Sequence, residues 1–417
     1  MSAPIARSVA EHAAVVAELI GPTVTATVPL CGSRGSVTAS TIVAGTRLPR
    51  FDNSAVDGFA VAAGGRRLTV DERQEFELVG QINAEPGEYP RLVAGLALRI
   101  MTGAPVPDGV DAVVAQEHVT RDGDRIRIAG GIAPSLNIRA AGEEVPDGAV
   151  IARRGAVMTA GLAGLCAALG INTVEVYAKL RVAILSTGSE LVEGSAGSPR
   201  HELRPGEILA SNAIMLTHAV AECGATVVHT ATVSDDPEDF LDAMTRAGAL
   251  ADVVITSGGI GFGDHDVVKS SLRDRGVDLC IVNMRPGRPQ GAGRFEGVAV
   301  VTLPGNPLAA LASFEAFIRP ALRTAMGFSG DGRPTLRAQL NHTIDTRPGT
   351  VRFILGAVAN APSGSVPVVD LTTTGRGLSA VIGANCFTFL DTDRPRLAAG
   401  DLVTVTVEGG APGDLAR

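Results

Sequence analysis

The chain has 417 residues, of which 45% are apolar, so it is long enough to form about three domains with buried cores. Its net charge of −8 and its aromatic content of 3%, with no Trp, argue against a nucleic-acid-binding protein. The five cysteines are scattered and form no C-x-x-C pair, so we expect buried thiols in a reducing compartment.

We expect neither a signal peptide nor a membrane span. The N-terminal segment carries Glu11 and His12 within a predicted helix, which no signal peptide would do. The most apolar helical segment, Thr159–Leu169, is too short to cross a bilayer. We therefore predict a cytoplasmic protein without membrane contact.

The first part of the chain predicts a helix followed by a β-rich region. Apolar residues recur at helical spacing over Ile5–Ile20. Residues 46–139 contain short alternating segments separated by Gly, Pro and Asp, which is typical of a β-rich domain. A second helix is expected to begin with Thr159 as its N-cap. We predict that both helices form one N-terminal and linker unit (residues 1–45 and 140–178), into which the β-rich domain is inserted.

Residues 179–328 alternate between β-branched segments and helical segments. This alternation predicts a doubly wound sheet of parallel strands, with ligands bound at the carboxyl ends of the strands. Residues 329–417 alternate between apolar and polar positions, which predicts a small β-barrel or sandwich. The expected strands of residues 179–328 are Arg181–Ser186, Thr226–Thr232, Asp252–Thr256 and Gly297–Leu303, and the expected helices are Ser211–Cys223, Pro237–Ala247, Val267–Arg275 and Leu308–Leu322.

Glycines and small polar residues follow the predicted strands of this α/β domain. The densest stretch is Thr256–Lys269, where four glycines follow a buried strand. Without a Cβ, these glycines let backbone N–H groups approach an anion, so we expect a phosphate-bearing ligand. A plain strand-to-helix turn is the alternative, and a dinucleotide fingerprint fits poorly because it belongs after the first strand of its unit. The expected ligand-binding residues are Thr187, Gly188, Ser257, Gly258, Gly259, Gly263, Pro304, Gly305, Asn306 and Pro307.

Three carboxylates from separate loops are candidate ligands of a divalent cation. They are Glu190, Asp235 and Asp266, and Mg²⁺ needs only one or two carboxylates beside a phosphate. Solvated surface acids are the alternative, and one acid of the Asp235-Asp236 pair can cap the next helix. No Ser-His-Asp order supports covalent acyl transfer.

The segment Arg285–Pro289, RPGRP, places two guanidinium groups on a stiff turn. Arg offers paired N–H donors to phosphate or to a tetrahedral oxyanion, so Arg285 and Arg288 are candidate anion ligands. A turn with solvated arginines is the alternative.

Seven stretches of the chain together resemble the molybdopterin molybdenumtransferase family, which includes MoeA and the E domain of gephyrin. They occur in the family's order over nearly the whole chain and are jointly specific. The stretches are Pro49–Val61, Arg99–Glu117, Arg139–Val145, Ser186–Leu191, Thr256–Lys269, Arg285–Pro289 and Leu303–Glu315.

The resemblance implies a four-part protomer, a homodimer, and contacts with other proteins of molybdenum-cofactor synthesis. The implied reaction inserts molybdate into adenylylated molybdopterin, with Mg²⁺-dependent release of AMP. The four parts would be residues 1–45 with 140–178, 46–139, 179–328 and 329–417. The resemblance implies that the pterin nucleotide lies on the glycine loops, that Asp57, Thr102, Glu190 and Asp266 are catalytic, that Glu190, Asp235 and Asp266 hold Mg²⁺, and that Arg285, Arg288 and Pro289 bind molybdate.

Three positions depart from the family's pattern near the implied molybdate site. Ile281 stands where the family has Lys, Leu355 where Arg is expected, and Thr373–Gly375 lacks the family's Ser. A missing cation beside a dianion weakens its electrostatic stabilisation. The alternatives are therefore a paralogue that binds or carries the pterin without efficient metal insertion, a scaffolding protein like the gephyrin E domain, and a nicotinamide-dependent dehydrogenase.

Overall fold

The computed structural model describes residues 5–65, 74–128, 131–194, 203–261, 266–330, 333–359, 365–372 and 377–408. The chain separates into two compact units. The first holds Met1–Ala26, Gly35–Ala39 and Glu175–Arg417, and the second holds Thr27–Arg34 and Ser40–Val174. None of the helices in these described ranges is long and apolar enough to cross a membrane.

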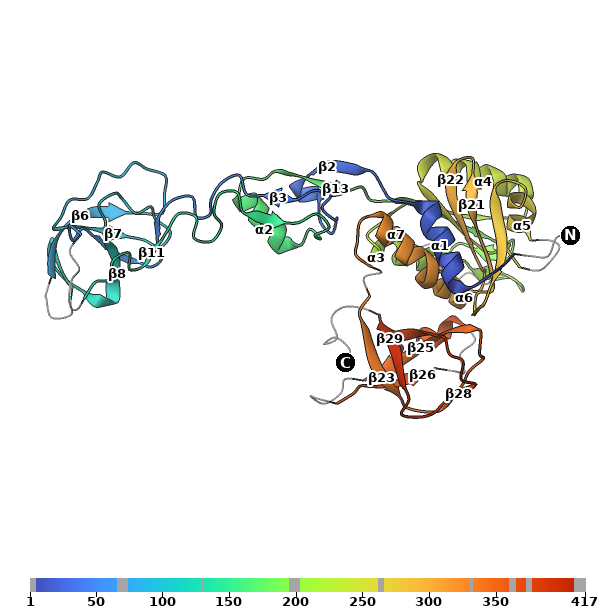
Figure 1. Cartoon of the computed structure of the whole chain (residues 1–417). Helices are drawn as coiled ribbons and strands as arrows, with labels where there is room; N and C mark the ends of the chain where they lie inside the picture. Colours follow the sequence, from blue (N-terminus) through green and yellow to red (C-terminus); the bar gives the residue numbers. More distant parts are fainter. Residues whose placement is uncertain are drawn as a thin grey trace. The chain divides into compact units, whose positions relative to one another are not determined.

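A seven-stranded mixed sheet forms the centre of the first unit (Figure 1). The strands β17, β14, β18 and β22 run parallel, as predicted, but β21 is antiparallel to both of its neighbours. The prediction of a wholly parallel sheet is therefore wrong at this end, because the connections on both sides of β21 are too short for a crossover. In sheet order the strands are β1 (Ile5–Arg7), β19 (Val277–Val282), β21 (Pro289–Phe295), β22 (Val298–Leu303), β18 (Val253–Ser257), β14 (Arg181–Thr187) and β17 (Thr226–Val233).

Helices cover both faces of this sheet. Along β14, Val182 and Ile184 belong to one apolar core while Ala183 and Leu185 belong to the other, as successive residues of a strand must. The first core includes residues of α1, α3, α6, η3 and α7, and the second includes residues of α4 and α5. The bounds are α1 (Val9–Ile20), α3 (Ser211–Glu222), α4 (Pro237–Leu250), α5 (Val267–Leu272), α6 (Pro307–Ser313), the π-helix η3 (Phe314–Ile318) and α7 (Arg319–Ala325).

The N-terminal helix differs from its prediction. It begins only at Val9, where Ser8 Oγ accepts the N–H of Glu11 at 3.1 Å and the Glu11 carboxylate accepts the N–H of Ser8 at 2.7 Å. The preceding residues Ile5–Arg7 extend the sheet as β1. Val16 of α1 is buried in the α/β core, and α1 packs on α7 and η3. The second helix, α2 (Ala160–Ala168), belongs to the other unit, and its pairing with α1 stays a prediction.

Other predicted helix ends also shift. The helix predicted over Ser211–Cys223 is α3, and its N-cap residue Ala210 provides no side-chain hydrogen bond. The helix predicted over Leu308–Leu322 is the continuous series α6, η3 and α7. Asp236 does cap α4, and its carboxylate accepts the N–H groups of two residues in the first turn.

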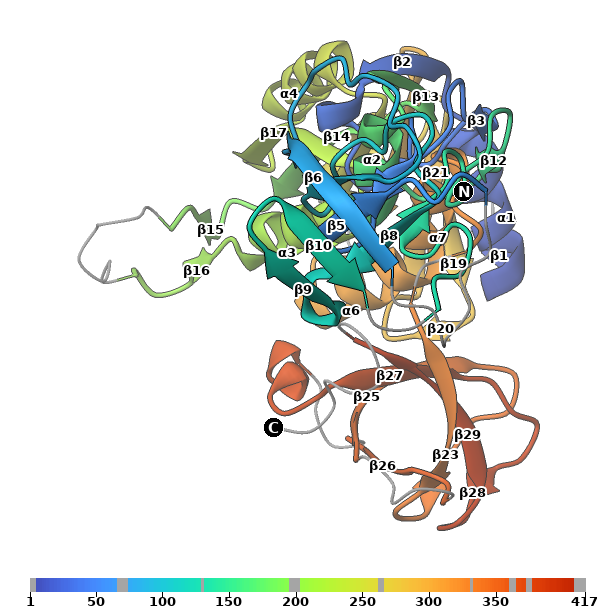
Figure 2. The ribbon, with the colours of Figure 1, turned by 90° about the vertical axis from the view of Figure 1, so that its left-hand side faces the viewer.

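The C-terminal part of the first unit is a closed five-stranded barrel, as predicted, and Figure 2 shows its strands around a ring. It closes because β25 pairs with both β26 and β27, while β23 pairs with β26 and β29 and β27 pairs with β29. Along β29, Val403 and Val405 are buried and Leu402 and Thr404 are exposed, so one face of each strand fills the interior. The strands are β23 (Thr335–Leu340), β25 (Val351–Val358), β26 (Val368–Leu371), β27 (Cys386–Leu390) and β29 (Leu402–Val407), and the short elements are β24 (Ile344–Asp345), β28 (Arg396–Leu397) and the 3₁₀ helix η4 (Leu378–Val381).

A six-stranded sheet is the main feature of the second unit, which confirms the predicted β-rich region. Phe59, Phe76, Val114 and Ile126 form much of its core. In sheet order the strands are β8 (Ala112–Ala115), β5 (Gly58–Val61), β7 (Leu96–Ile100), β6 (Gln74–Ile82), β10 (Arg125–Ile128) and β9 (Val119–Asp122). Shorter elements are β2 (Thr25–Pro29), which pairs with β13 (Thr173–Tyr177), together with η1 (Leu30–Gly32), β3 (Ile42–Val43), β4 (Asn53–Ser54), η2 (Gln116–His118), β11 (Ile138–Arg139) and β12 (Val150–Ala152).

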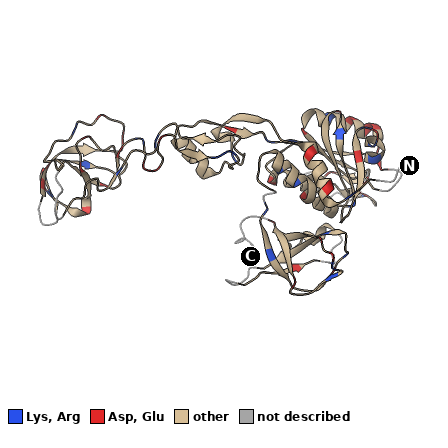
Figure 3. Ribbon diagram, viewed as in Figure 1, with Lys and Arg blue, Asp and Glu red and all other residues tan. Residues whose placement is uncertain are grey.

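The second helix begins as predicted. Thr159 is the N-cap of α2, and its hydroxyl accepts the N–H of Leu162 at 3.2 Å. Over the described residues, acidic and basic side chains are scattered along the ribbon instead of gathering in one segment (Figure 3).

Candidate functional site

Loops at the carboxyl ends of β14, β17, β18 and β22 line one cavity of about 450 Å³, which we call the glycine pocket. The loops meet because these four strands run parallel and end at the same edge of the sheet. Of the predicted site residues, those lining it are Thr187, Gly188, Glu190, Asp235, Ser257, Gly258, Gly259, Asp266, Pro289, Pro304, Gly305 and Pro307. Asn306 instead serves as the N-cap of α6, where its side chain accepts the N–H of Ala309, and Gly263 lies outside the described residues.

Gly258 lets three loops approach one another in the floor of the glycine pocket. It has a φ of +100°, and a Cβ added there would lie 2.4 Å from the carbonyl oxygen of Thr187. Its N–H donates to the carbonyl of Leu303 at 3.0 Å, and its Cα lies 3.3 Å from the Cβ position of Gly305. Only glycine fits this backbone path, so the predicted role of these glycines has a steric basis.

Asn212 of α3 lines the same pocket and was missed from the sequence. Its side-chain N–H group donates to the carbonyl of Gly305 at 2.9 Å and lies 3.4 Å from Ser257 Oγ. Its Oδ1 is buried and accepts no hydrogen bond from the described residues. The one signal in the sequence is a polar residue placed among the buried positions of an otherwise apolar helix face.

The three predicted carboxylates line one pocket without forming a ready metal site. Asp266 Oδ2 is buried and unpaired among the described residues, and the Glu190 carboxylate lies 2.6 Å from the Cβ position of Gly188. Asp235 accepts the N–H of Ser189 at 2.9 Å and donates its own N–H to Ser189 Oγ at 3.2 Å. In the described ranges, no three His, Cys, Asp or Glu side chains lie close enough to hold a metal ion. These donors fit Mg²⁺ only when a ligand phosphate completes its oxygen shell.

The remaining predicted catalytic residues, Asp57 and Thr102, belong to the second unit, whereas the glycine pocket belongs to the first. They contact each other: the N–H and the hydroxyl of Thr102 each donate to Asp57 Oδ1 at 2.7 Å. The backbone hydrogen bond from Thr102, followed by that from its hydroxyl, lowers the pKa of Asp57 below its ordinary value. Asp57 is thus held as a carboxylate.

A second cavity, of about 640 Å³, is lined by Arg285, Arg288, Arg347 and Arg352, and we call it the arginine cavity. Its walls come from the turn before β21 and from the barrel, both in the first unit. The two cavities are lined by consecutive residues, because Arg288 faces the arginine cavity while Pro289 lines the glycine pocket. Pro289 thus lines the glycine pocket, while the two arginines with which it was predicted to act line the neighbouring arginine cavity.

The positions that depart from the family pattern are mostly occupied by apolar packing residues. Leu355 of β25 is only 2% exposed and belongs to the core that also contains Phe387. Ile281 lies in β19 opposite Pro289 and is half-buried. Thr373–Gly375 lies outside the described residues. Sequence analysis did not identify Arg347 and Arg352, because no local motif marks them and only the fold of the barrel brings them to the cavity.

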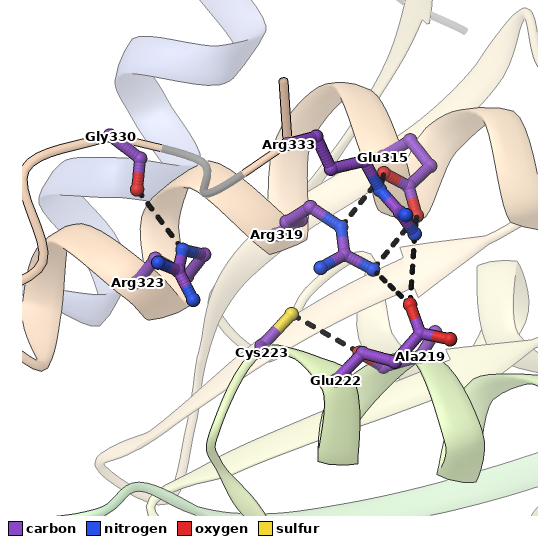
Figure 4. A network of polar contacts seen from close by, with 8 residues as sticks. All are labelled: Ala219, Glu222, Cys223, Glu315, Arg319, Arg323, Gly330 and Arg333. Atoms are coloured by element: carbon purple, nitrogen blue, oxygen red, sulfur yellow. Dashed lines mark hydrogen bonds and ion pairs between the residues drawn. The ribbon is translucent and has the colours of Figure 1, made fainter. Parts of the chain in front are cut away.

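A buried network of ion pairs joins the α/β domain to the start of the barrel (Figure 4). Glu315, whose side chain is 1% exposed, pairs with Arg319 at 2.8 Å and with Arg333 at 2.9 Å. Both arginines also pair with Glu222 of α3 at 2.9 Å. Because Arg333 immediately precedes the barrel, these contacts fix where the barrel begins relative to α7.

Two family models match the chain in succession. Residues 7–170 match the MoeA N-terminal region (domain I and II), and residues 183–324 match a probable molybdopterin binding domain. The chain is 42% identical to molybdopterin molybdenumtransferase 2 of Mycobacterium tuberculosis, covering 86% of this chain and 89% of the relative. It is 32% identical to the molybdopterin molybdenumtransferase of Haemophilus influenzae, covering 92% of this chain and 94% of the relative.

A solved structure agrees with these matches. The crystal structure of a molybdopterin biosynthesis MoeA protein from Pyrococcus horikosii has a TM-score of 0.79 and 28% sequence identity with this chain. The match covers 97% of this chain and 100% of that one.

Proposed function

The chain belongs to the molybdopterin molybdenumtransferase family, and from that premise we propose that it inserts molybdate into adenylylated molybdopterin with release of AMP. The observation that carries this proposal is the adjacency of two cavities with complementary chemistry. One offers glycine loops and carboxylates, and the other offers four arginines, with the turn Arg285–Pro289 contributing to both.

The glycine pocket suits a phosphate-bearing nucleotide. Backbone groups around Gly258 and Gly259 can approach phosphate oxygens closely because no Cβ intervenes. The unpaired Oδ1 of Asn212 is an acceptor for an N–H group of the ligand, as a pterin or adenine ring would present. The pocket therefore offers a loop for the phosphates and an acceptor for one ring of a pterin nucleotide.

Asp266, Glu190 and Asp235 would hold Mg²⁺ beside the ligand's phosphates. When bound, the ion neutralises charge on the phosphate whose bond to the pterin side is broken. Asp266 contributes the buried Oδ2, and the two hydrogen bonds between Asp235 and Ser189 hold the β14 and β17 loops together. These side chains thus orient the phosphates.

The arginine cavity suits molybdate, which is a tetrahedral dianion. Guanidinium groups present forked N–H donors that match pairs of oxyanion oxygens. Arg285 and Arg288 are exposed side chains on the wall of this cavity. Binding there would place molybdate next to the residue, Pro289, that also lines the nucleotide pocket.

We further propose that the protein is a cytoplasmic homodimer. We also propose that Asp57 and Thr102 are catalytic residues, as the family resemblance implies. Support for Asp57 is its lowered pKa, which keeps a carboxylate available as a hydrogen-bond acceptor. Sedimentation analysis tests the dimer, and a monomer at micromolar concentration contradicts it.

The decisive test incubates the purified chain with adenylylated molybdopterin, Mg²⁺ and molybdate, and measures AMP by chromatography. AMP release should require all three additions, and tungstate in place of molybdate tests the choice of metal. If the nucleotide binds and no AMP appears with either oxyanion, the transferase proposal is wrong.

A second candidate function is a carrier that binds the pterin nucleotide without inserting metal efficiently. The observation that favours it is that apolar residues occupy positions 281 and 355. If it holds, Ile281→Lys, at a half-buried position, should raise AMP release from a low base, whereas Leu355 is buried in the core and stays unchanged in this test. Fast release by the wild-type chain contradicts the carrier.

A further inference from the structure

Four arginines line the arginine cavity, and Arg285 and Arg288 are only two of them. We propose that Arg352 and Arg347, on the barrel side of the cavity, bind the same oxyanion and complete a site that Arg285 and Arg288 begin. The identity of the oxyanion as molybdate rests on the proposed function, whereas the presence of an oxyanion site rests on the cavity itself.

Strand pairing sets Arg285 and Arg352 side by side. β20 (Met284–Arg285) pairs in parallel with β25, and the register places Arg285 opposite Arg352. Side chains at such positions are immediate neighbours, and like charges there repel each other. An oxyanion between the two guanidinium groups turns this repulsion into attraction, because each group faces a negative oxygen.

Hydrogen bonds to Asn283 hold the loop that carries Arg347 against the same strand. The backbone oxygen of Asn283 accepts the N–H of Val351 at 3.0 Å, and its side chain accepts the hydroxyl of Thr350 at 3.3 Å. Its side-chain N–H group also donates to the carbonyl of Gly349. These bonds hold the loop of residues 347–351 against Asn283, which lies two residues before Arg285 in the chain. In this position Arg347 lines the arginine cavity.

No carboxylate among the described residues neutralises this group of arginines. Asp345 is the acidic residue on the cavity wall, and its carboxylate pairs with Arg396 at 3.2 Å. Arg352 uses one N–H to donate to the backbone oxygen of Asp345 at 2.5 Å, which orients the guanidinium without cancelling its charge. The cavity thus keeps an excess of positive charge that a small dianion would balance.

This arrangement accounts for Leu355. Arg352 and Leu355 are three positions apart on β25, so they face opposite sides of the strand. Leu355 is buried in the core, whereas Arg352 is half-buried on the cavity wall. A cation is therefore supplied to the cavity from the same strand, while the side chain at position 355 packs in the core that includes the helices of the α/β domain.

The test measures binding of sodium molybdate, tungstate and sulfate to the full-length chain by calorimetry. Arg352→Gln and Arg347→Gln should each weaken molybdate binding about 10- to 100-fold, as expected when one charged hydrogen-bonding partner is lost. Arg352→Lys, which keeps the charge and loses the fork, should fall between wild type and Arg352→Gln. Arg337→Gln is the matched control, because Arg337 is exposed on β23 of the same barrel and does not line the cavity.

Nucleotide binding and AMP release are measured on the same samples. The affinity for adenylylated molybdopterin should be unchanged in both glutamine variants. Thermal unfolding checks the fold, and Arg347→Gln keeps the test valid if Arg352→Gln unfolds, because Arg347 is an exposed loop residue.

The outcomes separate the two proposals. Wild-type molybdate affinity in both glutamine variants overturns the assignment of the barrel arginines, even if AMP release is normal. Arginine-dependent molybdate binding without AMP release overturns the transferase function and leaves the oxyanion site standing. Failure of the wild-type chain to bind molybdate overturns both.

Discussion

The glycine pocket and the arginine cavity are built in opposite ways. The glycine pocket uses backbone shape: its loops follow four parallel strands, and its glycines pack so closely that a Cβ added to Gly305 would lie 3.3 Å from the Cα of Gly258. The arginine cavity uses side-chain charge, and its walls come from a turn of the α/β domain and from a separate barrel. The first depends on the local fold of one sheet, and the second depends on how two folds are joined.

This difference predicts that a substitution can impair ligand binding in one cavity without impairing it in the other. A change in the glycine loops should impair nucleotide binding and leave oxyanion binding nearly intact. A change that loosens the barrel should do the reverse.

Glu315→Ala should have the largest effect, because it removes the buried carboxylate that pairs with both Arg319 and Arg333 and leaves the more exposed Glu222 beside them. Removing one partner of a buried ion pair lowers the free energy of unfolding by about 3–5 kcal/mol. Denaturant titration measures this loss, and molybdate binding should weaken before nucleotide binding does. A loss below about 1 kcal/mol, the range of surface pairs, would show that the network does not secure the barrel.

Asp266→Asn should slow AMP release about 100-fold, the range seen when a group that stabilises developing charge is removed. The reason is that Asp266 Oδ2 is buried and has no hydrogen-bond partner among the described residues, so this oxygen is available to Mg²⁺. The measurement is AMP release over a Mg²⁺ titration. Asp242→Asn, on the exposed face of α4 and paired with Arg246, is the control and should behave as wild type. Equal Mg²⁺ dependence in both variants would argue against a metal at Asp266.

Gly258→Ala should lower the free energy of unfolding by about 2–3 kcal/mol, from left-handed strain together with steric overlap. The added Cβ would lie 2.4 Å from the carbonyl oxygen of Thr187, at a φ of +100°. Nucleotide affinity should fall while molybdate affinity holds. Gly194→Ala is the control, since a Cβ there meets nothing within 4 Å. Equal stability of Gly258→Ala and Gly194→Ala would contradict the close approach between Gly258 and the carbonyl of Thr187.

Thr102→Val should have the smallest effect, because it removes one of two hydrogen bonds to Asp57 and keeps the backbone donor. These bonds favour the charged carboxylate, so the pKa of Asp57 is lowered in the folded chain. Their stabilising contribution is present above the ordinary value of 3.8 and is lost as the pH falls through the lowered pKa. In the variant the pKa should rise toward 3.8, which a carbon-detected NMR titration of Asp57 measures. Thr102→Ser keeps the hydroxyl and should titrate like wild type.

The glycine pocket could be predicted largely from the sequence, because each of its loops is a contiguous motif at the end of a strand. Parallel strands in one sheet bring such loops together regardless of the rest of the chain. Asn212 escaped this reasoning because a buried polar residue on an apolar helix face has a partner only once the helix is packed.

The sequence by itself determined the order of α and β segments, the family's motifs and the residues around Gly258, since these follow from local periodicity and from glycine's freedom at positive φ. Tertiary contacts alone set the antiparallel direction of β21, the packing of Leu355 in the core of the α/β domain, and the pairing of Arg352 with Arg285. The physical reason is that these contacts join residues that lie far apart in the sequence. Arg285 and Arg352 become neighbours only because a short strand of one domain pairs with the barrel of another, and no local pattern of charge or hydrophobicity records that pairing.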